Sequence, residues 1–448
     1  MVGELPNDGQ QVVWGNDLRL MCNPNHDLVR LANRLEWAQL ELRFTPLYSP
    51  IGRPSIPLRV MIGLLILAEM RKFSDEEAVK EFCQNFYWQY FCGYETLTWE
   101  APCHPTELGK FRQRIGPDGV EAILTWTVAH HQEKGNVQTK LVVIDSTVQE
   151  KNVTTPRDHK LYRKIAETIL GLAAAEGVVL RRSYRRVIRR QVMQLRTGNF
   201  PKARKRAARA TRRLRTIAGA LLRDFSRKVS PDRRWVHEDL IARMQWVLVQ
   251  PAGGPEHIYS LHEPQTYCIG KGKDRVQYEF GTKVTLAIDP HSGVIVGAMN
   301  HAKHRHDSHV MAEVSEQIES ITGAKPHEMI GDHGYRDAAE QARLLADGIR
   351  VITPADLKQA TKGTAEHRSL RRKLKLRSRI EAVIGHLKSD HRLGRNFLRG
   401  WLGDEQNVLL AAVGWNIKKL IRFFSDLLHG QTWATWARMI MPLNTATA

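Results

Sequence analysis

The chain has 448 residues, of which 42% are hydrophobic, and its 67 Lys and Arg exceed its 47 Asp and Glu to give a formal net charge of +20. This length predicts two to four domains with substantial cores, and the positive charge favours a polyanionic partner, although a membrane surface would fit the charge equally well. The five cysteines include no C-x-x-C pair, which argues against a disulfide framework and against a zinc finger.

The sequence carries no signal of secretion or of membrane insertion. Its first ten residues are polar and acidic, and its longest apolar run, residues 60–68, is too short to cross a bilayer. We therefore expect a soluble, cytoplasmic protein with no membrane partner.

Residues 1–135 are expected to form a helical N-terminal domain. Apolar residues at helical spacing over residues 58–66, and a capping box formed by Ser74 and Glu77, predict a pair of helices. A third helix is expected from Thr106 to Gly116, and it could enter a DNA major groove as part of a helix-turn-helix module. The alternative is a three-helix packing that binds nothing. Three basic residues would project from the third helix: Lys110, Arg112 and Arg114.

Residues 136–158 are predicted to begin a second, α/β domain. The apolar, largely β-branched run over residues 141–144 is typical of a central strand covered on both faces, and it ends in Asp145. Asp145 would thus lie where a buried strand reaches solvent, a common place for a site in an open α/β sheet. Alternatively, this acid only ends the strand.

Residues 159–250 are expected to form a basic helical insertion. Arginines recur at i and i+4 in two adjacent rows, and no acid occurs between Arg181 and Arg215. An uncompensated stripe of this kind favours contact with phosphate groups over simple solvation, and it would supply affinity without sequence readout. The candidate DNA contacts are Arg185, Arg186, Arg189 and Arg190.

Residues 251–400 are predicted to complete the α/β domain, with strands at 257–262, 280–288 and 294–298, the last two forming an antiparallel hairpin. Four histidines follow, His301, His304, His306 and His309. A zinc site there is less favoured than a polar turn before a helix that Asp307 opens, because the spacing is irregular.

A short strand over residues 328–331 is expected to end in Asp332. A helix over 338–346, a strand over 350–353 and a basic loop over residues 358–375 should follow it. The final segment, residues 401–448, is expected to form a C-terminal helix and tail.

The stretch from Arg377 to Arg395 predicts a helix with one acid among cations. An apolar stripe of Ile380, Val383, Ile384 and Leu387 should face inward, and Glu381 should lie beside Arg377 on one edge with Lys388 further along it. An exposed ion pair is the plain alternative.

Two acids at like ends of neighbouring parallel strands, faced by one acid from a packed helix, could converge. The three are Asp145, Asp332 and Glu381. Carboxylates that close repel one another and need cations, and oxygen ligands select Mg²⁺, or Mn²⁺ as a substitute. Two such ions about 4 Å apart would promote phosphodiester cleavage without a side-chain nucleophile.

The motifs around these acids resemble those of DDE transposases of bacterial insertion sequences, in the insertion-sequence-five group related to the insertion-sequence-four group. The matching segments are IDST, YEFGTKVTLA, GDHGY and SRIEAVIGHLKSDHRLGR. Arg377, Glu381 and Lys388 match the family's arginine, glutamate and lysine, whereas Leu374 and Ala382 stand where the family has tyrosine and commonly proline.

The resemblance implies a ribonuclease-H-like mixed α/β sheet and a cut-and-join reaction on the terminal inverted repeats of double-stranded DNA. It also implies a homodimer or larger assembly on DNA, in the bacterial cytoplasm at the nucleoid, with Arg377, Lys388 and Arg395 near the DNA. Two other interpretations remain open: a nuclease on the same fold that does not join ends, and a DNA-binding protein with an inactive site.

Overall fold

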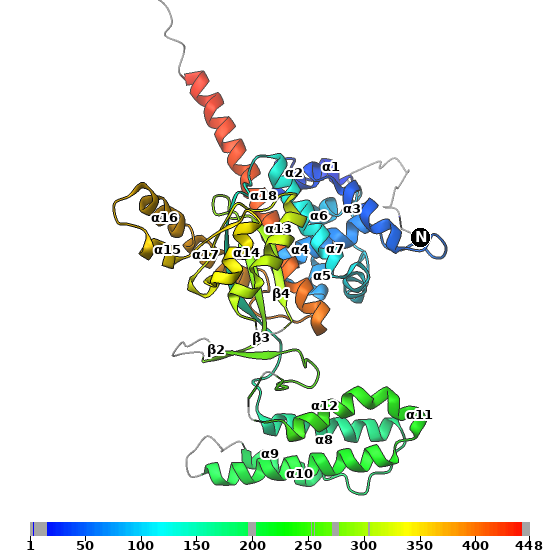
Figure 1. The fold of residues 1–448 in the computed structure, drawn as a ribbon. Coiled ribbons are helices and arrows are strands. Elements are labelled where there is room, and N and C mark those ends of the chain that lie inside the picture. The colour runs from blue at the N-terminus through cyan, green and yellow to red at the C-terminus, as the bar shows by residue number, and fades with distance from the viewer. Residues whose placement is uncertain are drawn as a thin grey trace, which may run out of the picture. The chain divides into compact units, whose positions relative to one another are not determined.

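The computed structural model describes residues 3, 16–195, 203–251, 253–254, 256–270, 277–302 and 305–440, with side chains described as far as residue 425. The chain divides into two compact units (Figure 1). Unit 1 comprises residues 1–149, 283–301 and 305–448, and unit 2 comprises residues 150–282 and 302–304. The sequence suggests five parts, and that division stays a prediction. The helices before residue 135 share one hydrophobic core with the sheet of unit 1.

The N-terminal part of unit 1 is helical, as expected. Its elements are α1 (Leu18–Met21), α2 (Asp27–Arg34), α3 (Trp37–Phe44), η1 (Thr45–Leu47), α4 (Leu58–Arg71), α5 (Asp75–Gln84), α6 (Phe86–Phe91) and α7 (Thr106–Glu133). The predicted capping box of Ser74 and Glu77 begins α5. The third helix does not stop at Gly116. It kinks there, at φ 64° and ψ −177°, and continues from Pro117, which suits the first turn of a helix.

A mixed sheet forms the centre of unit 1. Its strands run in the order β4 (Ile295–His301), β3 (Tyr278–Ile288), β1 (Leu141–Glu150), β5 (Glu328–Ile330) and β6 (Arg350–Ile352). β1, β5 and β6 are parallel, and β3 and β4 form the predicted antiparallel hairpin. The coarse expectation of a mixed α/β fold is therefore confirmed. The parallel strands β1 and β5 are the ones that matter for the site.

One predicted strand is wrong. Residues 257–262 are irregular. The side chain of Gln250 accepts a hydrogen bond from the Ile258 N–H at 3.0 Å and donates one to the Ile258 carbonyl at 3.2 Å, so these backbone groups bond to a side chain and not to a neighbouring strand. The strand of this region is β2 (Tyr267–Gly270), which pairs with the first residues of β3 within unit 2.

The helices after β4 complete unit 1. They are η4 (Asp307–Val310), α13 (Met311–Thr322), η5 (His333–Tyr335), α14 (Ala338–Ala346), α15 (Pro354–Gln359), α16 (Ala365–Lys375), α17 (Ser378–Asp390) and α18 (Gly400–Ile440). The predicted basic loop over 358–375 is mostly helix. A capping box at Thr353 and Asp356 begins α15, and Thr364 caps α16, which buries only Leu370.

α18 packs on α7, α4 and β4. The amide of Asn416 on α18 donates to the Ile295 carbonyl and accepts from the Ile295 N–H, both at 2.9 Å, so it takes the place of a further strand beside β4. The same helix accepts a hydrogen bond at 3.0 Å from buried His131 of α7, through the Asn416 carbonyl. The N-terminal helices and the sheet are thereby held together by polar bonds as well as by apolar packing.

Unit 2 consists mainly of helices. Its helices are α8 (Asp158–Ala175), α9 (Arg185–Leu195), α10 (Arg204–Lys228), α11 (Pro231–Arg234), η3 (Trp235–His237) and α12 (Glu238–Val249). Their apolar faces form a separate core that includes Ile165, Leu221 and Phe225. The arginine rows are shorter than expected, because α9 begins only at Arg185, after Tyr184 with a φ of 53°. In the described part of the chain, no helix has both the length and the apolar character of a membrane span.

Candidate active site

The structure brings Asp145 of β1 close to Asp332, which directly follows β5 and precedes η5. The expectation that the first strand ends at Asp145 is wrong, because β1 continues to Glu150. Val143 on β1 is aligned with Ile330 on β5, and each acid follows two residues later. Adjacent strands lie about 4.8 Å apart, so this register makes the two acids neighbours across β1 and the segment after β5. Burial, together with the negative charge of Asp332, raises the pKa of Asp145 to about 6. The two acids are thus electrostatically coupled.

Both carboxylates are oriented by backbone groups. Asp145 Oδ1 accepts from the Ser146 N–H at 2.9 Å, and Asp332 Oδ1 accepts from the Gly334 N–H at 2.8 Å. Ser146 Oγ in turn shares 2.8 Å hydrogen bonds with Thr285 Oγ1 and with the hydroxyl of Tyr335. Tyr335 is fully buried, so this network fixes the middle of β1 against the segment that follows β5.

The spacing of the motif GDHGY follows from this packing. A Cβ on Gly331 would lie 2.7 Å from the ring of Tyr335, so only glycine lets that ring lie against the backbone at the end of β5. A Cβ on Gly334 would lie 3.1 Å from a carboxylate oxygen of Asp332. The two glycines therefore leave room for the ring and for the acid.

A further acid, Asp307, belongs to this site, although its sequence context indicates only the start of a helix. Its Oδ2 also lies 3.1 Å from the Cβ position of Gly334, and its charge contributes to the raised pKa of Asp145. Lys283 of β3 balances it at 2.7 Å, with a lysine side chain only 11% exposed. The sequence offered one signal for this acid, the presence of Lys283 within an otherwise apolar strand. A buried ammonium group needs a counter-charge, so this lysine predicts an acid nearby.

The histidines near Asp307 serve other roles. His301 shares a 2.8 Å hydrogen bond with Thr285, and His306 Nδ1 accepts from the Ser308 N–H, which caps η4. His304 lies outside the described residues. Within the described ranges, no three His, Cys, Asp or Glu side chains are grouped so that they could hold one metal ion.

Glu381 stands apart from the acid pair. It lies in the first turn of α17, its side chain is 54% exposed, and it accepts a hydrogen bond from Arg377 at 2.8 Å. Arg377 also acts on Asp145, whose pKa it lowers against the effect of burial. Arg377 thus binds Glu381 directly and affects Asp145 through its charge. The predicted inward stripe of this helix is confirmed for Ile380, Val383 and Leu387, and Ile384 is half-buried.

The candidate DNA contacts in unit 1 fall into different surroundings. Lys388, Arg395 and Arg112 line one cavity of about 750 Å³. The expectation that Arg112 projects from its helix is wrong, because it is buried and its guanidinium donates to both carboxylate oxygens of Asp75, at 2.9 and 2.5 Å. This bidentate pair ties Arg112 to α5 and gives it a role in the fold.

The two other basic residues of that helix are more accessible. Lys110 is 64% exposed and pairs with Glu107, and exposed Arg114 lies over the ring of Tyr48 at 4.3 Å. Their role toward DNA stays a prediction.

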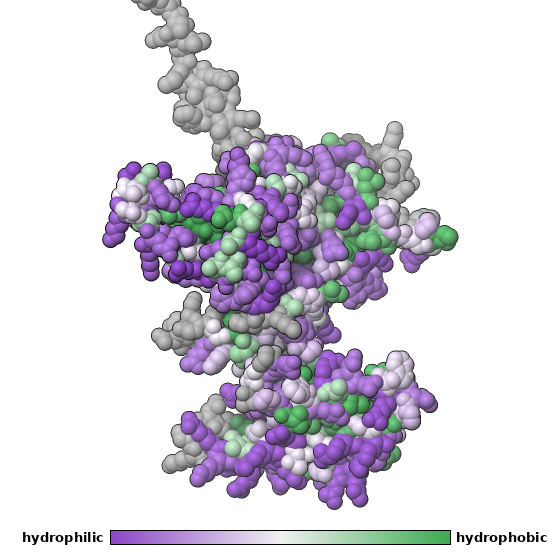
Figure 2. All heavy atoms as spheres, viewed as in Figure 1, coloured by the Kyte–Doolittle hydropathy of each residue, from purple (hydrophilic) through white to green (hydrophobic). Residues whose placement is uncertain are grey.

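The four arginines of α9 are exposed: Arg185, Arg186, Arg189 and Arg190. Among the described residues none of the four forms an ion pair. The surface over α9 and α10 is correspondingly hydrophilic (Figure 2). α9 thus presents unneutralised positive charge to solvent.

Comparison with known proteins gives two family matches. Residues 16–114 match a family described as transposase domain (DUF772), and residues 255–417 match a family described as transposase DDE domain. Asp332 and Glu381 fall inside the second match, and Asp145 lies outside both. A relative from Rhizobium meliloti, described as uncharacterized protein ORF8 in nfe locus, is 36% identical over 194 residues, which is 43% of this chain and 94% of the relative. No solved structure matches the chain.

Proposed function

The chain belongs to the DDE transposases of insertion-sequence elements, which are metal-dependent DNA-cleaving enzymes, and from this premise we propose how it acts. It binds the terminal inverted repeats of its element, cleaves the DNA ends by phosphodiester hydrolysis at Asp145, Asp332 and Glu381, and joins the 3′ ends to target DNA. The observation that supports this most is the position of Asp145 on β1 next to Asp332, which follows the paired strand β5.

The residues of the site fit a divalent ion. Asp145 and Asp332 supply neighbouring oxygen ligands, and the raised pKa of Asp145 reflects burial and negative charge, which a cation would offset. Glu381 would complete the set from α17 once it leaves Arg377. Two bound Mg²⁺ ions, or Mn²⁺ in their place, would supply Lewis-acid stabilisation of the attacking and leaving oxygens.

The remaining groups of the site would position rather than cleave. Arg377 holds Glu381 at 2.8 Å, and it would be free to bind a phosphate when Glu381 is engaged. Lys388 lies further along the same helix, in its last turn, and would hold a neighbouring phosphate. Ser146 and Tyr335 keep the acid pair in register.

Nicking of a supercoiled donor plasmid that carries the element ends tests this proposal. We expect Asp332→Asn and Glu381→Gln to bind the ends and to lose metal-dependent nicking. Asp337→Asn is the matched control, because Asp337 only caps α14 and asparagine caps a helix equally well. Undiminished nicking by either site variant would refute the assignment.

Joined products in the same reaction separate the proposed transposase from its alternatives. A nuclease would nick without joining, and a DNA-binding protein with an inactive site would do neither. We expect the 3′ ends to be joined to target DNA when Mg²⁺ is present.

A further inference from the structure

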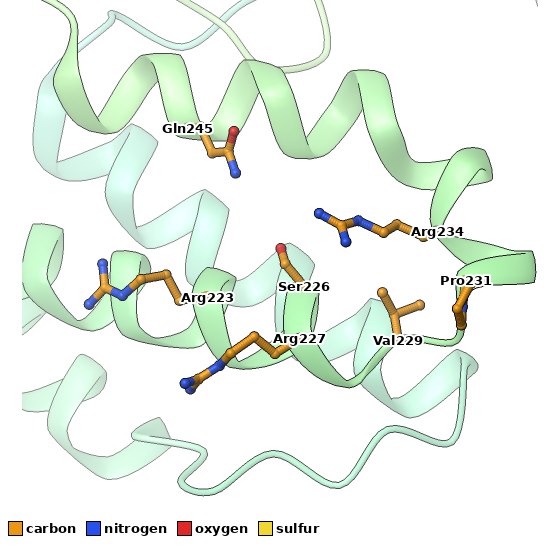
Figure 3. A pocket seen from close by; sticks show the side chains of 7 residues that line it. All are labelled: Arg223, Ser226, Arg227, Val229, Pro231, Arg234 and Gln245. Carbon is orange, nitrogen blue, oxygen red and sulfur yellow. The ribbon is translucent and has the colours of Figure 1, made fainter.

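Unit 2 contains a cavity of about 500 Å³ between α10, α11 and α12. Figure 3 shows the Ser226 hydroxyl, the Arg234 guanidinium and the Gln245 amide pointing into the same space from these three helices. Arg223 and Arg227 extend along α10 at one side of it. The other lining residues are Val229 and Pro231, so the described lining includes no carboxylate.

Of the cavity's donors, Arg227 pairs with Asp224 at 3.7 Å, whereas the others lack an acceptor within the described part of the protein. Ser226 Oγ is buried there without a hydrogen-bond partner. Among the described residues, the side chains of Arg223, Arg234 and Gln245 also make no hydrogen bond or ion pair. A buried hydroxyl without a partner costs about 1–3 kcal/mol, so its position requires an explanation beyond folding.

Neighbouring cations of the same helices are satisfied. Arg233, next in sequence to Arg234, pairs with Glu176 at 2.9 Å, and Arg215 of α10 donates to the Leu248 carbonyl at 2.7 Å. Lys228 pairs with Asp224 at 3.3 Å. Arg223 and Arg234 of the cavity, like the four arginines of α9, have no such partner among the described residues, but they lie next to the unpaired hydroxyl of Ser226.

We propose that this cavity binds one phosphate group of a DNA strand. Two guanidinium groups, an amide and a hydroxyl offer donors in several directions, which suits a tetrahedral group with several acceptor oxygens. The volume exceeds that of a phosphate alone and accommodates its attached sugar. The exposed arginines of α9 attract the backbone in general, whereas a cavity would fix one phosphate and so the register of the strand.

This inference rests on the proposed function only in that DNA is the source of the phosphate. A free nucleotide or inorganic phosphate has the same chemistry. Both sources can be distinguished by binding alone, without metal and without cleavage. If the cavity does not bind phosphate, nicking of the element ends can still depend on Asp332. If nicking does not depend on Asp332, binding of phosphate in the cavity can still be measured.

The experiment scans single methylphosphonate substitutions along a duplex of the element end and measures binding by the full chain at fixed salt. We expect one position at which the neutral linkage weakens binding by the wild type about tenfold, the loss of one charge-assisted contact. Arg234→Gln and Ser226→Ala should be insensitive at that position. Arg243→Gln is the matched control, since it removes the same charge from α12 where Arg243 Nε donates to the Asp239 carbonyl.

Ser226→Ala guards against a folding artefact. Removing a buried hydroxyl without a partner should leave the thermal stability unchanged or raised while it weakens phosphate binding. Equal sensitivity of Arg234→Gln and wild type at every position would overturn the proposal. Binding of inorganic phosphate or a mononucleotide that depends on Arg234, with no sensitive position in the DNA scan, would overturn DNA as the source.

Discussion

The acid pair of Asp145 on β1 and Asp332 after β5 is balanced by single side chains. Lys283 neutralises Asp307 at 2.7 Å, and Arg377 lies where it acts on Asp145 while it binds Glu381. Several neighbouring carboxylates repel one another, and these two cations reduce that repulsion before any metal ion binds. Single-residue changes should therefore affect both stability and cleavage.

Replacing Lys283 with methionine is expected to leave Asp307 without its counter-charge. We expect the free energy of unfolding to fall by about 2–3 kcal/mol, somewhat less than for a fully buried pair because Asp307 is 26% exposed. Urea denaturation measures the change. The double variant K283M/D307N should recover most of the loss, and an equal or larger loss in the double variant would show that the pair does not stabilise the site.

Buried His131 predicts a pH dependence of stability. Burial lowers its pKa to about 4, so folding favours the neutral ring, which donates to the Asn416 carbonyl and accepts from Asn136. Its contribution is complete above the usual pKa of about 6.5 and is lost as the pH falls toward 4, because the unfolded chain then takes up a proton.

We therefore expect the wild type to exceed His131→Gln in unfolding free energy at pH 7. The difference should shrink as the pH falls below 6.5, by at most about 1.4 kcal/mol per pH unit. Denaturation curves at pH 7, 6 and 5 measure it. A difference that is constant over this range would mean that His131 does not carry the effect.

At the scale of elements, α9 provides the clearest test of DNA binding. We replace four residues of α9 with glutamine: Arg185, Arg186, Arg189 and Arg190. The slope of log affinity against log salt concentration should become less negative by up to about 3 to 4, if each arginine neutralises one phosphate. Titrations of a duplex of the element end at several salt concentrations give the slope. An unchanged slope would remove α9 from the interface.

The kink of α7 at Gly116 predicts a backbone effect. Its φ of 64° and ψ of −177° belong to a region that only glycine occupies readily, and no atom lies within 4 Å of its Cβ position. Gly116→Ala should cost about 1–3 kcal/mol through strain and not through a clash. Gly385→Ala in α17 is the matched control, because it has open space and no positive φ and should stabilise slightly. Equal effects of both changes would contradict this interpretation.

The sequence predicted elements where local signals and tertiary packing agree. Asp145 and Asp332 could be placed because each follows an apolar run, and α5 because its capping box is local. α16 was missed because it is almost wholly polar, and Arg112 was misplaced because its partner Asp75 is 37 residues away. Lys283 with Asp307 likewise becomes visible only when β3 meets η4.

At the scale of the whole molecule, the two units are expected to have different roles. Unit 1 carries the sheet with the acids and α17, and unit 2 carries α9 and the cavity of Ser226 and Arg234. Each has its own hydrophobic core, so changes in unit 2 are expected to alter DNA binding without altering the chemistry at Asp332. This separation lets binding and cleavage be tested independently.

The central claim is that Asp145, Asp332 and Glu381 hold divalent ions together. Fe²⁺ bound in place of Mg²⁺, with ascorbate and peroxide, cuts the polypeptide next to its ligands, and the fragments locate them. We expect cuts beside residues 145, 332 and 381 in the complex with the element ends, all competed by Mg²⁺ and all reduced together by Asp332→Asn. Cuts confined to other segments, or absent beside residue 381, would contradict the claim.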